Sequence, residues 1–218
     1  MQGALQFQRQ GDGVLKVGLT GGVACGKTTV LEMFAARGAH TLRADDIGAR
    51  LMQPGQAVYR HIVERFGSDI LKPDGTIDRP KLAAKAFDGR IEELNALVHP
   101  PVIEEQDRWA AEVGARDPHA VAIIEAALMV EAGAHKRMDK LIAVTCRLEQ
   151  RAERFAQRTG MTLETARAEV DRRMKWQLSN AEKIRVADYV IDNSGVLAVA
   201  EAEVNQLWRE LTRLAQST

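Results

Sequence analysis

A glycine-rich octapeptide near the N-terminus constrains this chain more than any other part of it. Gly21-Gly22-Val23-Ala24-Cys25-Gly26-Lys27-Thr28 fits the pattern G-x-x-x-x-G-K-S/T at every position. It follows an apolar run from Val14 to Leu19, typical of a buried parallel strand, and precedes apolar residues at helical spacing. Backbone N–H groups of such a loop surround a phosphate, and the dipole of the following helix attracts it further. The octapeptide, here called the P-loop, therefore predicts a nucleoside-triphosphate site.

Individual residues of the P-loop have distinct expected tasks. Gly21 and Gly26 allow a tight turn and a close approach of backbone to phosphate. Lys27 is expected to reach the β- and γ-phosphates, and the Thr28 hydroxyl to complete the Mg²⁺ shell. Cys25 lies near a helix N-terminus, which lowers the pKa of a thiol. We nevertheless interpret Cys25 as a small filler, because the sequence suggests no resolving cysteine.

The remainder of the chain alternates between strand and helix patterns. Apolar runs predict five strands, over residues 14–19, 40–43, 120–125, 140–144 and 187–191. Strands alternating with helices predict an α/β fold of the P-loop NTPase class. The expected architecture is a doubly wound, five-stranded parallel sheet with helices on both faces. An amphipathic helix from Val196 to Leu214 is expected to close it.

Two segments between the strands are expected to be helical. The longer one has no strand candidate, and we predict a helical insertion in which Asp78 caps one helix and His99-Pro100-Pro101 separates two others. The shorter one is polar, with Thr162 as a helix N-cap. The predicted division is a polar N-terminal extension (1–13), a nucleotide-binding core (14–45, 119–146 and 186–218), an acceptor-binding lobe (46–118) and a lid (147–185).

Composition excludes several classes of protein. Thirty basic residues balance thirty acidic ones and aromatic residues make up 5%, which argues against nucleic-acid binding. No apolar stretch approaches the roughly 18 residues of a membrane span, and residues 1–10 lack the apolar core of a signal peptide. Two cysteines are too few for a disulfide framework. We expect a cytoplasmic enzyme acting on small molecules, as a monomer or weak homo-oligomer.

Two motifs that are absent from the sequence exclude two classes of P-loop protein. The chain has no Asn-Lys, which a GTPase needs to read guanine, and no Leu-Ser-Gly-Gly-Gln of ABC-type ATPases. A compact kinase remains, and it needs an acidic group beside the acceptor hydroxyl. Asp45 follows the second predicted strand, at the edge where open α/β sheets bind ligands, and is expected to take the proton of that hydroxyl. The alternatives are that Asp46 is the base, or that one of the two caps the next helix.

A row of arginines predicts the mobile part of such a kinase. Arg147, Arg151, Arg154 and Arg158 recur at three- and four-residue steps and form one face of a helix. That face is expected to close over the triphosphate and to neutralise charge in the transition state. The alternative is a solvated face paired with Glu149 and Glu153. The P-loop favours the lid.

From about Val14 to Gly195 the chain resembles the dephospho-CoA kinase family. The matching segments are Gly18 to Thr29, Ala44-Asp45 with Ile47, Gln53-Pro54-Gly55, Gly75 to Arg79 with Leu82 and Phe87, Leu94 to Pro100, Leu128 to Glu131, Arg154, Arg158, Gln177, Lys183, and Ala187 to Gly195. The P-loop alone is common to many families, whereas the whole set in this order is specific.

The resemblance implies transfer of the γ-phosphoryl group of ATP to the ribose 3′-hydroxyl of dephospho-CoA, with Mg²⁺ as cofactor. The implied catalytic residues are Lys27, Asp45 and Arg154, the substrate contacts are Thr20, Asp45 and His99, and Thr28 is the metal ligand. The implied nucleotide contacts are Gly21, Gly22, Val23, Ala24, Cys25, Gly26, Lys27, Thr28, Thr29, Arg158 and Asn193, the last of these beside the adenine. For His99 we prefer a structural role, closing a helix before Pro100.

The chain departs from the family pattern at a few positions. Arg43 stands where the family often has a first Asp, Ala24-Cys25 replaces Gly-Ser, and Ala127 replaces a proline. Glu125 either orients a Mg²⁺-bound water or merely ends a strand. The alternatives to this function are another nucleotide or metabolite kinase of the same fold, and a P-loop switch that signals through a partner.

Overall fold

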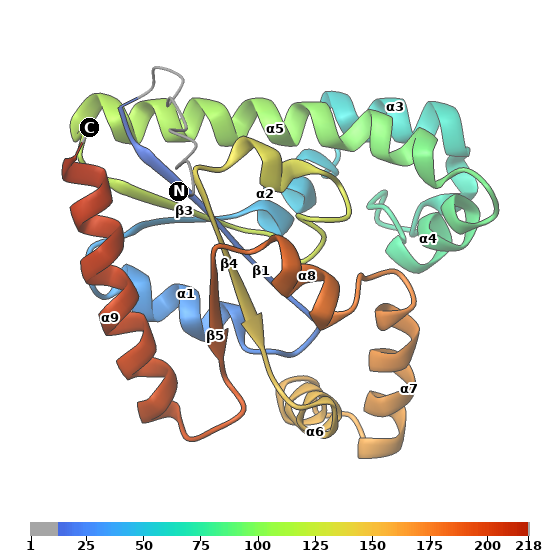
Figure 1. The fold of residues 1–218 in the computed structure, drawn as a ribbon. Helices are drawn as coiled ribbons and strands as arrows, with labels where there is room; N and C mark the ends of the chain where they lie inside the picture. The colour runs from blue at the N-terminus through green and yellow to red at the C-terminus, as the bar shows by residue number, and fades with distance from the viewer. Residues whose placement is uncertain (1–12, 218) are drawn as a thin grey trace. The chain divides into compact units, whose positions relative to one another are not determined.

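A parallel five-stranded sheet forms the centre of the nucleotide-binding part of the chain (Figure 1). The computed structural model describes residues 13–217, so the predicted N-terminal extension, apart from Gly13, lies outside the described residues. The strands are β1 (Leu15–Gly21), β2 (His40–Arg43), β3 (Val121–Glu125), β4 (Lys140–Thr145) and β5 (Tyr189–Asp192). Their order in the sheet is β2-β3-β1-β4-β5, which confirms the predicted fold class.

The register of the central strands brings the residues after them to one edge of the sheet. In β1, Leu19 lies opposite Glu125 of β3, and Gly21 lies opposite Val144 of β4. All five residues of β3 are buried, as expected of a strand covered on both faces. The P-loop after β1, the segment after β3 and the segment after β4 therefore leave the sheet side by side.

Helices cover both faces of the sheet. On one face α1 (Lys27–Ala35) packs against α9 (Leu197–Gln216), and Phe34, Val204 and Leu211 join Val17 in a continuous core (Figure 1). On the other face, α8 (Asn180–Val186) contacts β1 and β4. Gly18 of β1 also faces that side, where a Cβ atom would lie 2.5 Å from the Met129 sulfur.

The segment predicted as a lid is helical. It consists of α6 (Leu148–Thr159) and α7 (Leu163–Met174), which pack on each other, followed by α8. The Thr162 hydroxyl accepts a hydrogen bond from the Thr165 N–H at 3.3 Å, which confirms the predicted N-cap. Phe155 and Val170 join Val23 of the P-loop in a small apolar cluster, so the two helices are anchored to the nucleotide site.

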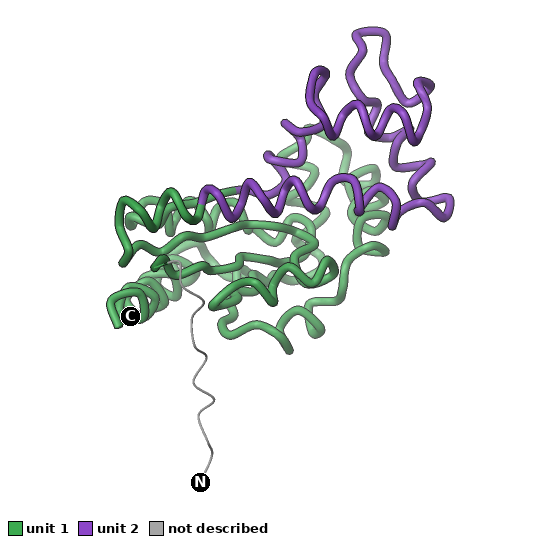
Figure 2. Tube along the Cα trace, turned by 90° about the horizontal axis from the view of Figure 1, so that it is seen from above, with its two compact units in different colours: residues 1–42, 110–218 green, residues 43–109 purple. Residues whose placement is uncertain are grey.

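Residues 43–109 form a separate compact unit, and the described residues up to Leu42 and from Ala110 onward form the other (Figure 2). The smaller unit contains α2 (Ala44–Leu51), α3 (Ala57–Phe66), the short helix Ser68–Ile70, α4 (Arg79–Phe87) and the beginning of α5 (Ile91–Arg116). Asp78 accepts a hydrogen bond from the Lys81 N–H at 3.2 Å, so it caps α4 as predicted. The larger unit also holds the short helix Ala134–Arg137.

The predicted break at His99-Pro100-Pro101 is wrong, because α5 runs through both prolines without interruption. A proline inside a helix removes a backbone hydrogen bond and crowds the carbonyl four residues earlier. Contacts within the smaller unit hold α5 on either side of the prolines. Glu93 pairs with Arg65 at 2.7 Å before them, and Glu105 pairs with Arg50 after them. These tertiary contacts outweigh the tendency of the two prolines to end the helix.

Across residues 13–217, none of the helices combines the length and the apolar character that a bilayer crossing requires.

Two leucines of α9 test how much of the stability comes from the core. Leu211 is fully buried against the sheet, whereas Leu197 is 56% exposed. We expect Leu211→Ala to lower the free energy of unfolding by about 2–5 kcal/mol, since it leaves a cavity. The matched change Leu197→Ala is expected to stay within about 0.5 kcal/mol of the parent. Urea unfolding measures both, and equal effects would contradict the placement of α9.

Candidate active site

The P-loop has the backbone conformation that phosphate binding requires. Gly26 has a φ of 89° and caps α1, and a side chain there would collide with the Asn193 carboxamide. Ala24 has a φ of 56°, a left-handed conformation that costs a residue with a Cβ atom about 1 kcal/mol or more. The loop thus turns sharply into α1, whose N-terminal N–H groups and helix dipole favour binding of an anion.

Lys27 and Glu125 come together beside the loop. The Lys27 ammonium donates to the Gly22 carbonyl at 3.2 Å and lies 4.0 Å from a carboxylate oxygen of Glu125. Glu125 is 4% exposed at the end of β3, so its charge faces the site rather than bulk solvent. Thr28, on the first turn of α1, is half-buried. Lys27 therefore lies beside a carbonyl and a buried carboxylate, and Thr28 follows it directly in the chain.

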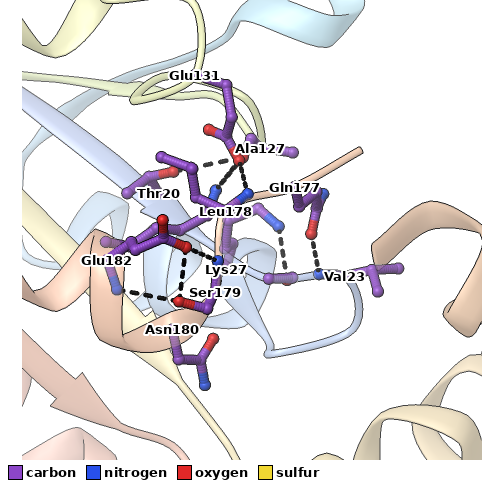
Figure 3. A network of polar contacts seen from close by, with 12 residues as sticks. Thr20, Val23, Lys27, Ala127, Glu131, Gln177, Leu178, Ser179, Asn180 and Glu182 are labelled. Atoms are coloured by element: carbon purple, nitrogen blue, oxygen red, sulfur yellow. Dashed lines mark hydrogen bonds and ion pairs between the residues drawn. The ribbon is translucent and has the colours of Figure 1, made fainter. Parts of the chain in front are cut away.

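Two carboxamide side chains hold the P-loop from outside. The Val23 N–H donates to the Gln177 side-chain oxygen at 3.0 Å (Figure 3). The Asn193 amide group donates to the Cys25 carbonyl at 2.9 Å from a position that is 6% exposed. Asn193 was predicted beside the adenine, and that role stays a prediction. Gln177 received no role from the sequence, although it belongs to the family-like set.

Arg151 contacts the P-loop directly, whereas the sequence predicted it only as one of four arginines on a helix face. Its guanidinium lies flat against Gly22, where a Cβ atom would be 2.7–2.8 Å from three of its atoms. The residue is 5% exposed and donates to the Asn180 side chain at 2.6 Å. Its Nε is buried and has no hydrogen-bond partner among the described residues. A buried donor left unpaired is costly, so this nitrogen is suited to an anion.

The other arginines of the predicted face divide into two groups. Arg154 donates to the Asn193 carbonyl at 2.8 Å and has a second buried guanidinium nitrogen with no partner in the described part of the chain. Arg147 donates to the Ser194 carbonyl at 3.1 Å. Arg158 is exposed and lies 5.1 Å from the Phe155 ring centre, so its predicted nucleotide contact stays a prediction. The hydrogen bonds of Arg151 and Arg154 go to asparagines, not to Glu149 or Glu153 as a solvated face would require.

A buried polar network lies behind the P-loop, centred on the carbonyl of Ala127 (Figure 3). Lys183 is 1% exposed, donates to that carbonyl at 2.7 Å and lies 2.8 Å from Glu131. The Leu178 N–H donates to the same carboxylate at 2.8 Å. The Thr20 hydroxyl, also fully buried, is directed at the Ala127 carbonyl at 3.5 Å. The substrate contact predicted for Thr20 stays a prediction.

The two cysteines meet beneath the P-loop. The Cys146 thiol, just after β4, lies 3.4 Å from the Cys25 sulfur and donates a hydrogen bond to it. That bond, helped by the charges of Arg151 and Lys27, lowers the pKa of Cys25, although burial opposes the shift. The same contact and burial raise the pKa of Cys146. The interpretation of Cys25 as a filler without a partner is wrong, because the fold brings together two cysteines that are 121 residues apart in the chain.

In the smaller unit, Asp45 is the second residue of α2 and is exposed. The helix begins at Ala44, directly after β2, and Arg43 occupies the N-cap position. Neither Asp45 nor Asp46 is therefore the N-cap, although both carboxylates favour the positive end of the helix. Asp46 pairs with Arg43 at 3.4 Å.

His99 lies half-buried in the middle of α5, and burial lowers its pKa. The structural role preferred from the sequence, closing a helix before Pro100, is wrong because the helix continues. A contact between His99 and the acceptor stays a prediction. Burial favours the neutral imidazole, so such a contact would be a hydrogen bond rather than an ion pair.

A cavity of about 410 Å³ opens within the smaller unit, between α2, α4 and the turn that precedes α4. Met52 and Ile77 give it apolar surface, while Lys72 and Arg79 give it positive charge. A site with this lining suits a ligand that carries both an apolar and an anionic part.

The buried lysine behind the P-loop provides a test of the network. We expect Lys183→Met to lower the free energy of unfolding by about 3–5 kcal/mol, because it removes the cation that pairs with the Glu131 carboxylate and leaves that carboxylate only the Leu178 N–H as a partner. Lys175→Met, the same change at an exposed position of the same unit, is expected to cost no more than about 0.5 kcal/mol. Chemical denaturation of both variants measures the difference. A loss below about 1 kcal/mol for Lys183→Met would show that the ion pair is dispensable.

Comparison with known proteins agrees with this geometry. The family model described as dephospho-CoA kinase matches residues 15–198. The dephospho-CoA kinases of Corynebacterium glutamicum and Aquifex aeolicus are each 38% identical to this chain, over 91% of it and 98% of their own length. A Thermus thermophilus structure aligns with a TM-score of 0.73 at 28% identity, covering 90% of this chain and 97% of that one.

Two further structures support the fold. Dephospho-CoA kinase from Campylobacter jejuni aligns with a TM-score of 0.65 at 24% identity, over 92% of this chain and 98% of its own. Shikimate kinase from Aquifex aeolicus aligns at 0.51 with 13% identity, over 93% and 98%. The family match begins in β1 and ends in α9, so it includes the P-loop, both helical segments and the last strand. This chain belongs to the dephospho-CoA kinase family.

Proposed function

We propose that this chain transfers the γ-phosphoryl group of ATP to the ribose 3′-hydroxyl of dephospho-CoA, giving coenzyme A and ADP. The observation that carries the proposal is the P-loop, with Lys27 and the buried Glu125 beside it, in a member of the dephospho-CoA kinase family. We also propose a cytoplasmic location, where ATP is available as the phosphoryl donor.

Phosphoryl transfer needs positioning and charge stabilisation more than covalent chemistry. In this proposal the P-loop N–H groups and Lys27 hold the β- and γ-phosphates. Arg151 and Arg154, each with a buried guanidinium nitrogen that lacks a partner in the described part, supply positive charge from the lid side. Such preorganised donors stabilise charge that develops in the transition state without a reorganisation cost. Val23 exchanges its hydrogen bond to Gln177 for a phosphate oxygen, so nucleotide binding is coupled to this lid contact.

Mg²⁺ fits the oxygen donors at this corner. It prefers oxygen ligands in an octahedral shell and is usually held by few protein groups together with substrate phosphates. Thr28 would hold it through its hydroxyl, and Glu125 through a water molecule. When bound, the ion supplies charge neutralisation to the β- and γ-phosphate oxygens.

Residues 46–118 are proposed to bind the acceptor, and residues 147–185 to act as the lid. Asp45, which follows β2 by two residues, is the proposed base for the acceptor hydroxyl. The cavity lined by Lys72 and Arg79 supports an acceptor that carries phosphate groups. His99 and Thr20 remain candidate acceptor contacts.

Coupled measurement of ADP release tests the proposed substrate. Dephospho-CoA is expected to raise ATP turnover strongly, while adenosine, AMP and shikimate leave it near the rate without acceptor. Mass spectrometry of the product is expected to show one added phosphoryl group. Stimulation by one of the other acceptors and not by dephospho-CoA would indicate another metabolite kinase. Turnover indifferent to all four would favour a nucleotide-dependent switch.

A pair of adjacent aspartates tests the proposed base. Asp45→Asn is expected to lower kcat by about 10²–10⁴-fold, because a positioned general base is lost. The affinity for ATP should be nearly unchanged, since Asp45 does not belong to the P-loop. Asp46→Asn is the matched control and is expected to keep most of the turnover. Steady-state kinetics and binding of a fluorescent ATP analogue measure both quantities, and the reverse pattern would move the base to Asp46.

A further inference from the structure

Two cysteine thiols lie next to each other in the larger unit. The Cys25 and Cys146 sulfurs lie 3.4 Å apart, and both cysteines are free and buried. They join two segments that leave the same edge of the sheet, the P-loop after β1 and the residue after β4. The full sequence contains two cysteines, so this pair accounts for every thiol of the chain.

The surroundings make the two sulfurs chemically unequal. Cys25 receives the hydrogen bond from the Cys146 thiol, sits before the N-terminus of α1, and lies near the positive charges of Arg151 and Lys27. Together they outweigh the opposing effect of burial on the pKa and favour the thiolate, which is the nucleophilic form. Cys146 keeps its proton because the neighbouring sulfur and burial both disfavour a second negative charge. One sulfur is thus suited to attack an oxidant and the other to resolve the product.

We propose that Cys25 and Cys146 are a redox-modification site that a hydroperoxide converts to a disulfide, and that the disulfide prevents nucleotide binding by the P-loop. The loss of nucleotide binding rests on the proposed function, whereas formation of the disulfide does not.

The chemistry balances with hydrogen peroxide as the oxidant. The Cys25 thiolate attacks one peroxide oxygen, the O–O bond breaks, and the leaving hydroxide takes a proton to become water. Cys25 is then a sulfenic acid. The Cys146 sulfur attacks the Cys25 sulfur, the S–O bond breaks, and the Cys146 proton leaves with the hydroxide as a second water. Two thiols lose two electrons and two protons, and the peroxide accepts both.

The bond distorts the loop that it enters. The two sulfurs must approach from 3.4 Å to about 2.05 Å. The backbone of Cys25 is held by two hydrogen bonds, because its carbonyl accepts from the Asn193 amide and its N–H donates to the Gly22 carbonyl at 3.3 Å. The preceding residue, Ala24, is already in a left-handed conformation. We therefore expect the disulfide to displace the next residues, Gly26 and Lys27, and displacement of a reactive group by about 1 Å costs as much as 10²-fold in rate.

Peptide mapping tests the modification itself. Reduced protein is treated with hydrogen peroxide, its remaining thiols are alkylated, and the unreduced digest is examined by mass spectrometry. The expected product is one peptide pair that joins Cys25 to Cys146, in protein that remains a single chain on a non-reducing gel. Absence of that pair, or cross-linking between chains in its place, would overturn the proposal.

Nucleotide binding tests the consequence. The oxidised protein is expected to bind a fluorescent ATP analogue at least about tenfold more weakly than the reduced protein, with full recovery after dithiothreitol. Equal affinity in the cross-linked protein would overturn this half. If the reduced protein itself binds no analogue and phosphorylates no dephospho-CoA, the proposed function fails, while the peptide map still decides whether the site exists.

Cys146→Ala is the matched control, because it removes the resolving thiol and leaves the P-loop sequence intact. The reduced variant is expected to bind the analogue as the parent does, and its melting temperature shows whether loss of the buried thiol disturbs the core. Peroxide is expected to carry its Cys25 past the sulfenic acid to a sulfinic acid, which dithiothreitol does not reduce. Inactivation as reversible as in the parent would overturn the proposal. If the alanine variant melts early, Cys146→Ser serves in its place.

Discussion

The larger unit depends on holding a P-loop open before any phosphate arrives. Backbone N–H and carbonyl groups of a buried loop need hydrogen-bond partners. Gln177 takes the N–H of Val23, Asn193 holds the Cys25 carbonyl, and Lys27 folds back to the Gly22 carbonyl. These contacts come from the end of the lid segment, from the residue after β5 and from α1. The loop is therefore stabilised by the same elements that are proposed to act on the nucleotide.

Positive charge is concentrated around this loop and is only partly neutralised. Lys183 has Glu131 as its partner, and Lys27 has Glu125 within 4.0 Å. The guanidinium groups of Arg151 and Arg154 instead bind neutral oxygens of asparagines. A buried cation without an anion is costly, and a bound triphosphate would offset that cost. The two guanidinium groups therefore favour binding of an anion at this site.

Three of the departures from the family pattern, Ala24, Cys25 and Ala127, lie in or near the P-loop. Ala24 accepts a left-handed backbone that glycine would adopt freely, and Cys25 brings a thiol where a hydroxyl is usual. Cys146 and Arg151 then complete a cluster around that thiol. Ala127, in place of proline, still presents its carbonyl to Lys183 and Thr20.

The sequence by itself determined the fold class, the P-loop and the caps at Asp78 and Thr162, because each depends on local spacing and backbone preference. Its strand boundaries shifted by at most two residues, and the last strand begins at Tyr189 rather than Ala187. Only the tertiary structure decided that α5 continues through Pro100 and Pro101, since ion pairs on both sides of the prolines outweigh the local cost. It alone brought Cys146 to Cys25 and laid Arg151 on Gly22. Contacts between distant residues depend on strand order and register, which local patterns do not encode.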